Sequence, residues 1–180
     1  VMLLRAGIGP AEELKSNGIA VLADREGVGR NLHNHQFLYL VAHLKRQALP
    51  PAGQRDHTTA TWRFSSGVEN CPESDMYISY VAQTGWHALG RRISSLTPAV
   101  LKPFSRGRVR LEPGNPAGRP DIRFDFQSDD RDRQRHADAV RRAAELLLAP
   151  EVRALWHSAT PVARTHQLRK FNDINAYNNI

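Results

Sequence analysis

Two hydroxyl-bearing side chains, Tyr77 and Ser79, are spaced so that they could bind a polar substrate together. They alternate with Met76, Ile78 and Tyr80 in a run of strand-forming residues, and alternate side chains of a strand lie on opposite faces. If the apolar face packs on a core, the hydroxyls of Tyr77 and Ser79 could orient a substrate in a cavity on the other face. The same pattern fits a strand whose polar face meets solvent, and the residues alone leave both interpretations open.

Glycine pairs occur twice near the start of the chain, in Gly7-Ile8-Gly9 and in Gly27-Val28-Gly29. Glycine lets the backbone approach a neighbouring group closely. A dinucleotide site needs a GxGxxG segment between a strand and a helix, so that the pyrophosphate meets amide groups at the helix start. Neither pair has the third glycine, so the sequence predicts no complete dinucleotide-binding motif.

The other reactive side chains form no recognisable cluster. Cys71 is the single cysteine, so it cannot form an intrachain disulfide, and with no motif around it we interpret it as a small, partly buried residue. His43, within an apolar run, is interpreted as a core or edge histidine. We predict no metal site, and the lone cysteine is compatible with a reducing, cytoplasmic location.

The net charge of +7 raises nucleic acid as a partner, so the position of the charge matters. The arginines between Asp129 and Glu145 are balanced by acidic residues, as on a solvated helix face. The excess lies between Tyr77 and Leu111, where six basic residues occur and no acidic one. No nucleic-acid module accompanies it, so we expect no nucleic-acid partner. The stretch from Arg91 to Arg110 could face an acidic partner region, or serve a stand-alone module for anionic ligands.

Composition and hydropathy indicate a globular chain without a membrane span. Hydrophobic residues make up 41% of its 180 residues and charged residues 24%, as in soluble proteins. No apolar run approaches the roughly 20 residues that a membrane-spanning helix needs, and no leader precedes Val1. We therefore expect no membrane association.

The elements that would position these residues mix helices and strands. Pro10 can open a short helix that Gly18 ends, and Ile19, Val21 and Leu22 predict a buried strand after it. Further strands are predicted over residues 37–44, 62–64 and 75–81, with a loop over residues 45–61. Residues 86–103 have no clear pattern.

The last third of the chain predicts a hairpin and then a long helix. Val109 and Leu111 share one face of the first hairpin strand, and the second strand buries Ile122, Phe124 and Phe126. Ser128 or Asp129 can cap the helix, and Pro150 ends it. Its arginines are expected off the buried stripe, whose members recur at helical spacing: Ala137, Val140, Ala144, Leu147 and Leu148.

Two stretches resemble the glucose-methanol-choline (GMC) oxidoreductase family. Residues 6–35 resemble the family's GIGP(A/S)xxL segment followed by GxxVxxDxxGVGxNLxDH, with Ala6 in place of the usual Ser and Asn34 in place of the usual Asp. Residues 105–129 resemble SRGxVxLxxxDPxxxPxIxxxYxxxxxD, with Asn115 in place of Asp and Phe126 at the aromatic position. The length and ordered spacing make this more specific than a lone glycine motif.

The resemblance implies an α+β fold, with an antiparallel substrate-domain sheet flanked by helices and a remnant of the FAD-binding domain. Residues 1–36 would be the edge of that domain, and residues 37–180 an incomplete substrate-binding region. It further implies an FAD-dependent enzyme that transfers hydride from a small alcohol to flavin. Asn31, Leu32 and His35 would lie near the flavin, and Tyr77 and Ser79 would line the substrate side, which favours the cavity interpretation.

The resemblance also implies a part that is missing. The family's His-Pro-x-Gly segment supplies the histidine that accepts the alcohol's proton, and none of the eight histidines lies in such a segment. We therefore assign no catalytic residue. We expect the isolated chain to bind no FAD, to be inactive, and to need the remainder of its own flavin domain. A stand-alone ligand-binding module with a basic surface is the alternative.

Overall fold

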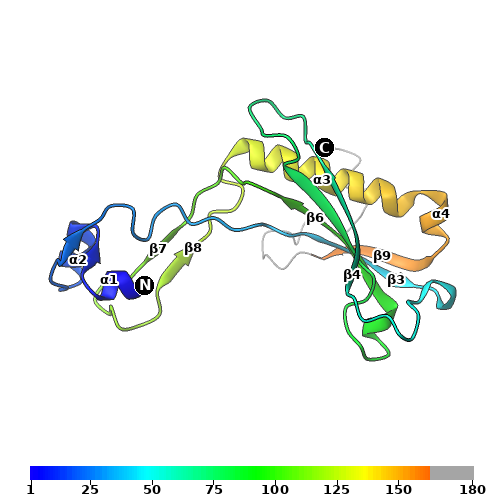
Figure 1. The fold of residues 1–180 in the computed structure, drawn as a ribbon, viewed down its shortest axis with the longest axis horizontal. Helices are drawn as coiled ribbons and strands as arrows, with labels where there is room; N and C mark the ends of the chain where they lie inside the picture. Colours follow the sequence, from blue (N-terminus) through cyan, green and yellow to red (C-terminus); the bar gives the residue numbers. More distant parts are fainter. Residues whose placement is uncertain (163–180) are drawn as a thin grey trace. The chain divides into compact units, whose positions relative to one another are not determined.

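The computed structural model describes residues 1–162. The chain divides into two compact units, one formed by Val1–Asn34 with Pro103–Asp132 and the other by His35–Lys102 with the chain from Arg133 onward (Figure 1). The second unit holds an antiparallel sheet flanked by a few helices, so the predicted α+β fold is confirmed. The return of residues 103–132 to the first unit was not predicted.

The first unit consists of two small sheets and two short helices. β1 pairs with β2 in parallel, and β7 pairs with β8 antiparallel. Leu4, Leu14 and Leu111 form its buried apolar cluster, with Ile19 and Val28 packed against it. The elements of this unit are α1 (Met2–Arg5), β1 (Ile8–Gly9), α2 (Ala11–Ser16), β2 (Ala23–Asp24), β7 (Arg108–Arg110) and β8 (Asp121–Arg123).

The local sequence signals for α2 are confirmed, but the strand predicted after it is wrong. Pro10 is the N-cap residue, and Gly18 has a φ of +68°, a left-handed conformation that glycine adopts without strain. The strand begins only at Ala23. Just before it, the Gly7 carbonyl accepts hydrogen bonds from the amides of both Leu22 and Ala23, at 2.7 and 3.1 Å, which is not the regular pairing of a strand. Leu22 is 76% exposed, so it is not the buried strand residue that its apolar character predicts.

The second unit is built on a five-stranded sheet with the strand order β4-β5-β6-β3-β9 and antiparallel neighbours throughout. The unassigned stretch 86–103 contains β6, the central strand. The predicted loop over residues 45–61 already contains the start of β4. The elements are β3 (Tyr39–Leu44), η1 (Arg46–Ala48), β4 (Thr58–Phe64), β5 (Met76–Val81), η2 (Gly90–Arg92), β6 (Ile93–Val100), α3 (Asp130–Leu148), α4 (Pro150–Arg153) and β9 (Trp156–Val162).

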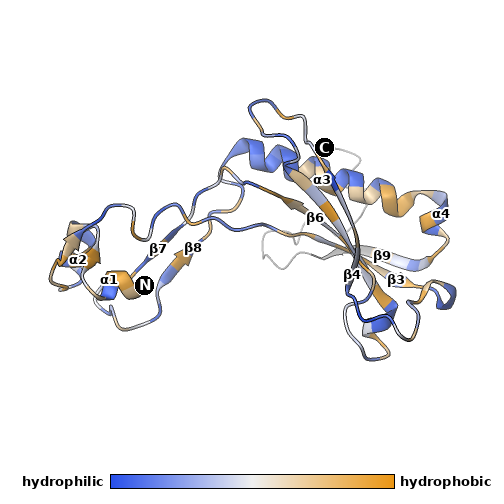
Figure 2. Cartoon of the chain, viewed as in Figure 1, coloured by the Kyte–Doolittle hydropathy of each residue, from blue (hydrophilic) through white to orange (hydrophobic). Residues whose placement is uncertain are grey.

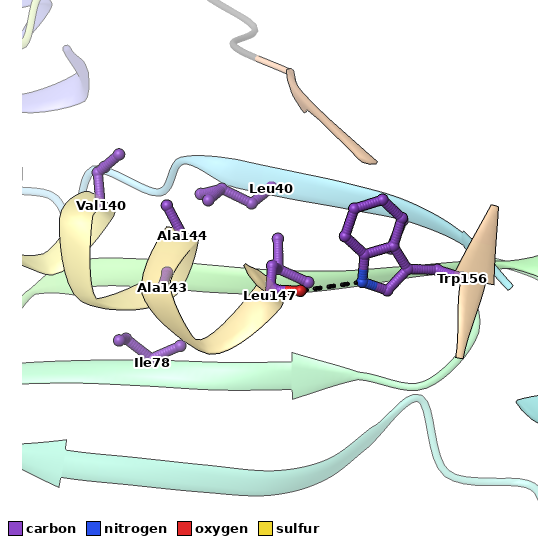
Figure 3. Close-up of a cluster of buried hydrophobic side chains, with 8 residues drawn as sticks. Leu40, Ile78, Val140, Ala143, Ala144, Leu147 and Trp156 are labelled. Atoms are coloured by element: carbon purple, nitrogen blue, oxygen red, sulfur yellow. Dashed lines mark hydrogen bonds between the residues drawn. The ribbon is translucent and has the colours of Figure 1, made fainter. Parts of the chain in front are cut away.

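Helix α3 packs along one face of this sheet, as Figure 3 shows in close-up. Asp129 caps the helix, since its carboxylate accepts the Arg131 amide at 3.0 Å. The Trp156 indole N–H donates to the Leu147 carbonyl at 3.1 Å and so ties β9 to the end of the helix. The apolar side chains that meet between helix and sheet are Leu40, Ala42, Ile78, Val140, Ala143, Ala144, Leu147 and Trp156.

The buried side of α3 differs from the predicted stripe. Ala137 is exposed and Leu148 is 45% exposed, whereas Ala139 and Ala143 are fully buried. The first half of the helix is hydrophilic (Figure 2), and yet Arg135 in it is completely buried. The expectation that Arg135 lies off the buried stripe is therefore wrong.

Arg135 is buried because it has an ionic partner on the sheet. Its guanidinium lies 3.0 Å from the Asp75 carboxylate, and both side chains have no exposed surface. Asp75 also accepts the amide and the hydroxyl of Ser66, each at 2.8 Å, while Arg135 donates to the carbonyls of Leu101 and Lys102. One ion pair thus joins α3, the start of β5, the end of β6 and the connection from β4 to β5.

Candidate functional site

Tyr77 and Ser79 lie on the sheet face opposite α3, as their alternation in β5 predicts. Met76 and Ile78, which alternate with them, are buried in the apolar clusters against the helix, with exposed fractions of 0% and 2%. The alternation fixes the faces because β-strand side chains have a period of two. Tyr77 and Ser79 are both half-buried rather than fully solvated.

Neighbouring strands bring more hydroxyl groups to this face. Thr61 of β4 and Thr97 of β6 lie opposite Ser79 on either side, and the Thr61 and Ser79 hydroxyl oxygens are 3.2 Å apart. Thr97 is only 4% exposed. Tyr39 of β3 alternates with the buried Leu40 and so adds a phenol to this face. We call the group Tyr39, Thr61, Tyr77, Ser79 and Thr97 the hydroxyl face. It offers hydrogen-bond donors and acceptors that carry no charge.

An aromatic row borders the hydroxyl face. The rings of His35 and Phe37 have centroids 6.3 Å apart, and those of Phe37 and Tyr77 6.1 Å apart, both in edge-to-face arrangements. Phe37 reaches this position because it forms an antiparallel bridge with Ala99, the residue that lies opposite Tyr77 in β6. The predicted residues His35 and Tyr77 are therefore connected through a ring that the sequence analysis did not select.

The phenol of Tyr77 is perturbed by its surroundings. Burial raises the pKa of Tyr77 above 10.0, and the neighbouring Tyr39 phenol raises it further, because a second phenolate nearby would repel the first. The pKa of Tyr80, on the helix side, is raised by burial and lowered in part by a hydrogen bond with Ser94. Tyr77 therefore stays protonated, as a hydrogen-bond donor, throughout the physiological range.

This arrangement predicts that Tyr39→Phe lowers the pKa of Tyr77 towards 10, because the substitution removes the second phenol but keeps the ring. The pKa of Tyr77 should remain above 10, since burial is the larger cause. Ring-labelled tyrosine followed by NMR through an alkaline titration would resolve the individual phenols. Tyr80 is the internal control, and its pKa should not move. An unchanged pKa of Tyr77 in Tyr39→Phe would contradict the proximity of the two phenols.

The predicted cofactor residues fall in different units. Asn31 and Leu32 belong to the first unit and His35 to the second. Asn31 has a φ of +54° and an exposed side chain, and Leu32 forms a two-way backbone bridge with Gly107, at 3.0 and 2.8 Å. The loop around Asn31 is therefore held by the Ser105-Arg106-Gly107 segment, a link between two motifs that lie far apart in the sequence.

A cavity of about 320 Å³ lies on the helix side of the sheet, away from the hydroxyl face. It is lined mainly by apolar side chains, among them Leu44, Leu146, Leu155 and Trp156, with Tyr80 at its wall. None of the predicted site residues lines it. Its apolar lining could accept a hydrophobic group but offers little to orient an alcohol.

The basic stretch is divided between the two units, with Arg91 in the second and Arg106 and Arg110 in the first. Arg91 donates to the Pro50 carbonyl at 2.7 Å, and Arg106 donates to the carbonyls of Pro103 and Ser105. Arg110 lies 3.8 Å from the Glu13 carboxylate. Several of these cations therefore have acceptors within their own unit.

Within residues 1–162 the structure also bears on Cys71, on groups of metal ligands and on membrane spans. Cys71 is partly buried and not disulfide-bonded, as predicted. No group of three or more potential metal ligands occurs in that range. Among the helices described, none has both the length and the apolar character that a membrane span needs.

The fold is similar to that of several solved oxidoreductases. Pyridoxine 4-oxidase from Mesorbium loti superposes with a TM-score of 0.72 at 21% identity, over 92% of this chain and 33% of that one. A crystal structure of formate oxidase gives a TM-score of 0.71 at 19% identity, over 93% of this chain and 38% of the other. At these identities the similarity establishes the fold.

Sequence comparison identifies the family. Residues 103–178 match the family model described as GMC oxidoreductase. The chain is 38% identical over 159 residues to 5-(hydroxymethyl)furfural oxidase from Methylovorus sp., covering 84% of this chain and 28% of that protein. It is 30% identical over 173 residues to oxygen-dependent choline dehydrogenase 1 from Chromohalobacter salexigens, covering 83% of this chain and 31% of that one. The chain belongs to the GMC oxidoreductase family, and it spans less than a third of the length of these relatives.

Proposed function

We propose that this chain forms the substrate-binding region of an FAD-dependent alcohol oxidoreductase, which transfers hydride from a small alcohol to the flavin. The hydroxyl face carries this proposal, because it places uncharged hydrogen-bonding groups and an aromatic row on one side of the sheet in a GMC-family chain. The names of the two relatives point to a hydroxymethyl compound or choline as the kind of alcohol.

The domain assignment forms part of this proposal. Residues 1–36 would contribute the edge of the FAD-binding domain and residues 37–180 the substrate-binding region. The similarity to proteins about three times as long supports a parent that contains the rest of the flavin domain. On this view the isolated chain binds no FAD and has no activity.

Asn31, Leu32 and His35 are the residues that we propose to lie near the flavin. Asn31 and His35 have exposed side chains that can contact it. Both backbone polar groups of Leu32 are engaged by Gly107, so Leu32 can offer only its apolar side chain. FAD, when bound, would supply the hydride acceptor.

Tyr77 and Ser79 would bind and orient the alcohol. The protonated Tyr77 phenol can donate a hydrogen bond to the alcohol oxygen, and the Ser79 hydroxyl can donate or accept one. A group that orients the alcohol contributes to the reaction rate by holding the reacting atoms at a suitable distance and orientation. We assign the proton-accepting role to no residue of this chain.

The proposal is tested by comparing the 180-residue chain with the intact parent protein. We expect the isolated chain to purify colourless, and the parent to show a flavin absorbance band that is bleached by its alcohol. A yellow isolated chain would contradict the proposed inactivity, and a parent without flavin would favour the ligand-binding alternative.

Site variants of the parent test the roles of Tyr77 and Ser79. Ser79→Ala and Tyr77→Phe should each raise KM for the alcohol about three- to tenfold while the flavin content stays constant, because each removes one substrate hydrogen bond. Ser16→Ala is the matched control, since the Ser16 hydroxyl donates to the Glu13 carbonyl in the first unit. An unchanged KM in both site variants would exclude this face as the alcohol site.

A further inference from the structure

Strand β9 contains an irregularity that places two histidines side by side. In its pairing with β3, His43 lies opposite Ser158 and Leu44 lies opposite Trp156, so His157 is an extra residue in the ladder. In such a β-bulge, two residues of one strand lie opposite a single residue of its partner, and the direction of a side chain changes. In regular pairing, one residue of β9 would lie opposite each residue of β3. The bulge instead brings His157 beside His43.

The two rings are close and face the same side of the sheet. Their centroids are 5.3 Å apart and their planes are inclined by 41°. His43 alternates with Ala42 and Leu44, which are buried on the helix side, so the pair lies on the opposite face. His43 is half-buried and His157 is exposed, which leaves the pair open to solvent.

This separation suits two imidazoles that bind one metal ion. With metal–nitrogen bonds of about 2.0–2.1 Å and an angle at the metal of about 90–109°, two ring centroids would lie about 4.5–5 Å apart. The nearby cations are engaged by backbone carbonyls, since Lys45 donates to Ala154 at 2.9 Å and Arg153 to Trp156 at 3.4 Å. The pair offers imidazole nitrogens as ligands, whereas Ca²⁺ and Mg²⁺ prefer oxygen ligands.

We propose that His43 and His157 form a binding site for a divalent first-row transition metal, with Cu²⁺ bound most tightly. Imidazole is a good ligand for copper, nickel and zinc, and copper heads the affinity order of such sites. No third protein ligand is found within residues 1–162, so water completes the coordination. Because the ligands lie on adjacent strands, the bound ion clips the edge strand β9 to β3.

The test uses the 180-residue protein and CuCl₂ as the probe. Calorimetric titration should show one copper equivalent bound, and the electron paramagnetic resonance spectrum should show coupling to two imidazole nitrogens. His43→Gln and His157→Gln should each lower copper affinity by about tenfold or more and leave at most one coupled imidazole nitrogen, because each removes half of the protein ligands.

His33→Gln is the matched control, because His33 is an exposed histidine of the first unit with another histidine two residues away. Copper affinity and the nitrogen coupling should be unchanged in this variant. The proposal is overturned if the His43→Gln/His157→Gln double variant binds copper as tightly as the unsubstituted 180-residue chain. It is also overturned if copper affinity falls in His33→Gln instead. Circular dichroism of each variant without metal separates loss of the site from loss of the fold.

Discussion

Asp75→Ala should lower the free energy of unfolding of the second unit by about 3–5 kcal/mol, because it leaves the Arg135 guanidinium buried without its ionic partner. Both side chains are fully buried and 3.0 Å apart, so the guanidinium loses its charged partner at a position away from solvent. Urea unfolding followed by tryptophan fluorescence measures this directly, since Trp62, Trp86 and Trp156 all belong to the second unit.

Two comparisons make the result specific to the ion pair. The double variant Asp75→Ala/Arg135→Met should recover much of the loss, because it buries no unpaired charge. The exposed pair of Arg141 and Glu145 in the same unit is the control, and Glu145→Ala should cost less than about 1 kcal/mol. If Asp75→Ala lowered the free energy of unfolding no more than Glu145→Ala, the buried pair would contribute little to the stability of this unit.

The same pair predicts an acid dependence. Burial alone would raise the pKa of Asp75, but hydrogen bonds from Ser66 and from Arg135 outweigh it and hold the pKa below 3.8. The stability that this carboxylate provides is therefore complete above the unfolded-state value of 3.8, and it is lost as the pH falls through the lower folded-state pKa. The stability difference between the native protein and Asp75→Asn should shrink over that acid range.

The second large effect is expected at Gly107, where the first unit has no room for a side chain. A Cβ at this position would meet the Arg123 carbonyl and come within 2.7 Å of the Phe124 Cα, so the β7–β8 hairpin would have to open. Gly107→Ala should therefore destabilise the first unit by about 1–3 kcal/mol. The two-way bridge between Gly107 and Leu32 should weaken with it.

Hydrogen exchange at the Leu32 amide measures the effect in the first unit, which has no tryptophan among its residues. This amide donates to the Gly107 carbonyl, and its exchange should become about ten- to a hundredfold faster in Gly107→Ala. Gly27→Ala is the control, because a Cβ at Gly27 has no neighbour within 4 Å. Unchanged protection of Leu32 in Gly107→Ala would show that the bridge does not depend on the close approach. In the intact parent, we expect Gly107→Ala to lower flavin retention as well.

Elements with a strong local pattern were predictable from the sequence. The alternation in β5, the cap and length of α3, and the helix stop at Gly18 all depend on neighbouring residues, and all three are confirmed. The central strand β6 was missed because Pro98 and a mixture of small polar and apolar residues hide its pattern. Its two neighbours in the sheet, β5 and β3, supply the pairing that holds it in place.

The site was only partly predictable, for a related reason. Alternation placed Tyr77 and Ser79 on one face, but their neighbours depend on strand register, which the sequence does not reveal. Tyr39 and Thr97 reach the hydroxyl face only through the pairing of β3, β6 and β5. The burial of Arg135 was equally hidden, since its partner lies 60 positions earlier in the chain.

Strand β4 forms one edge of the five-stranded sheet, and residues 58–63 of this strand are all exposed. An edge strand of seven residues with exposed backbone groups and a 43% exposed Trp62 is a template on which another chain can add a strand. The isolated chain is therefore open to self-association and aggregation through β4. A lysine introduced at Thr59, an exposed residue of this strand that is not a member of the hydroxyl face, is a rational way to limit this self-association at high concentration.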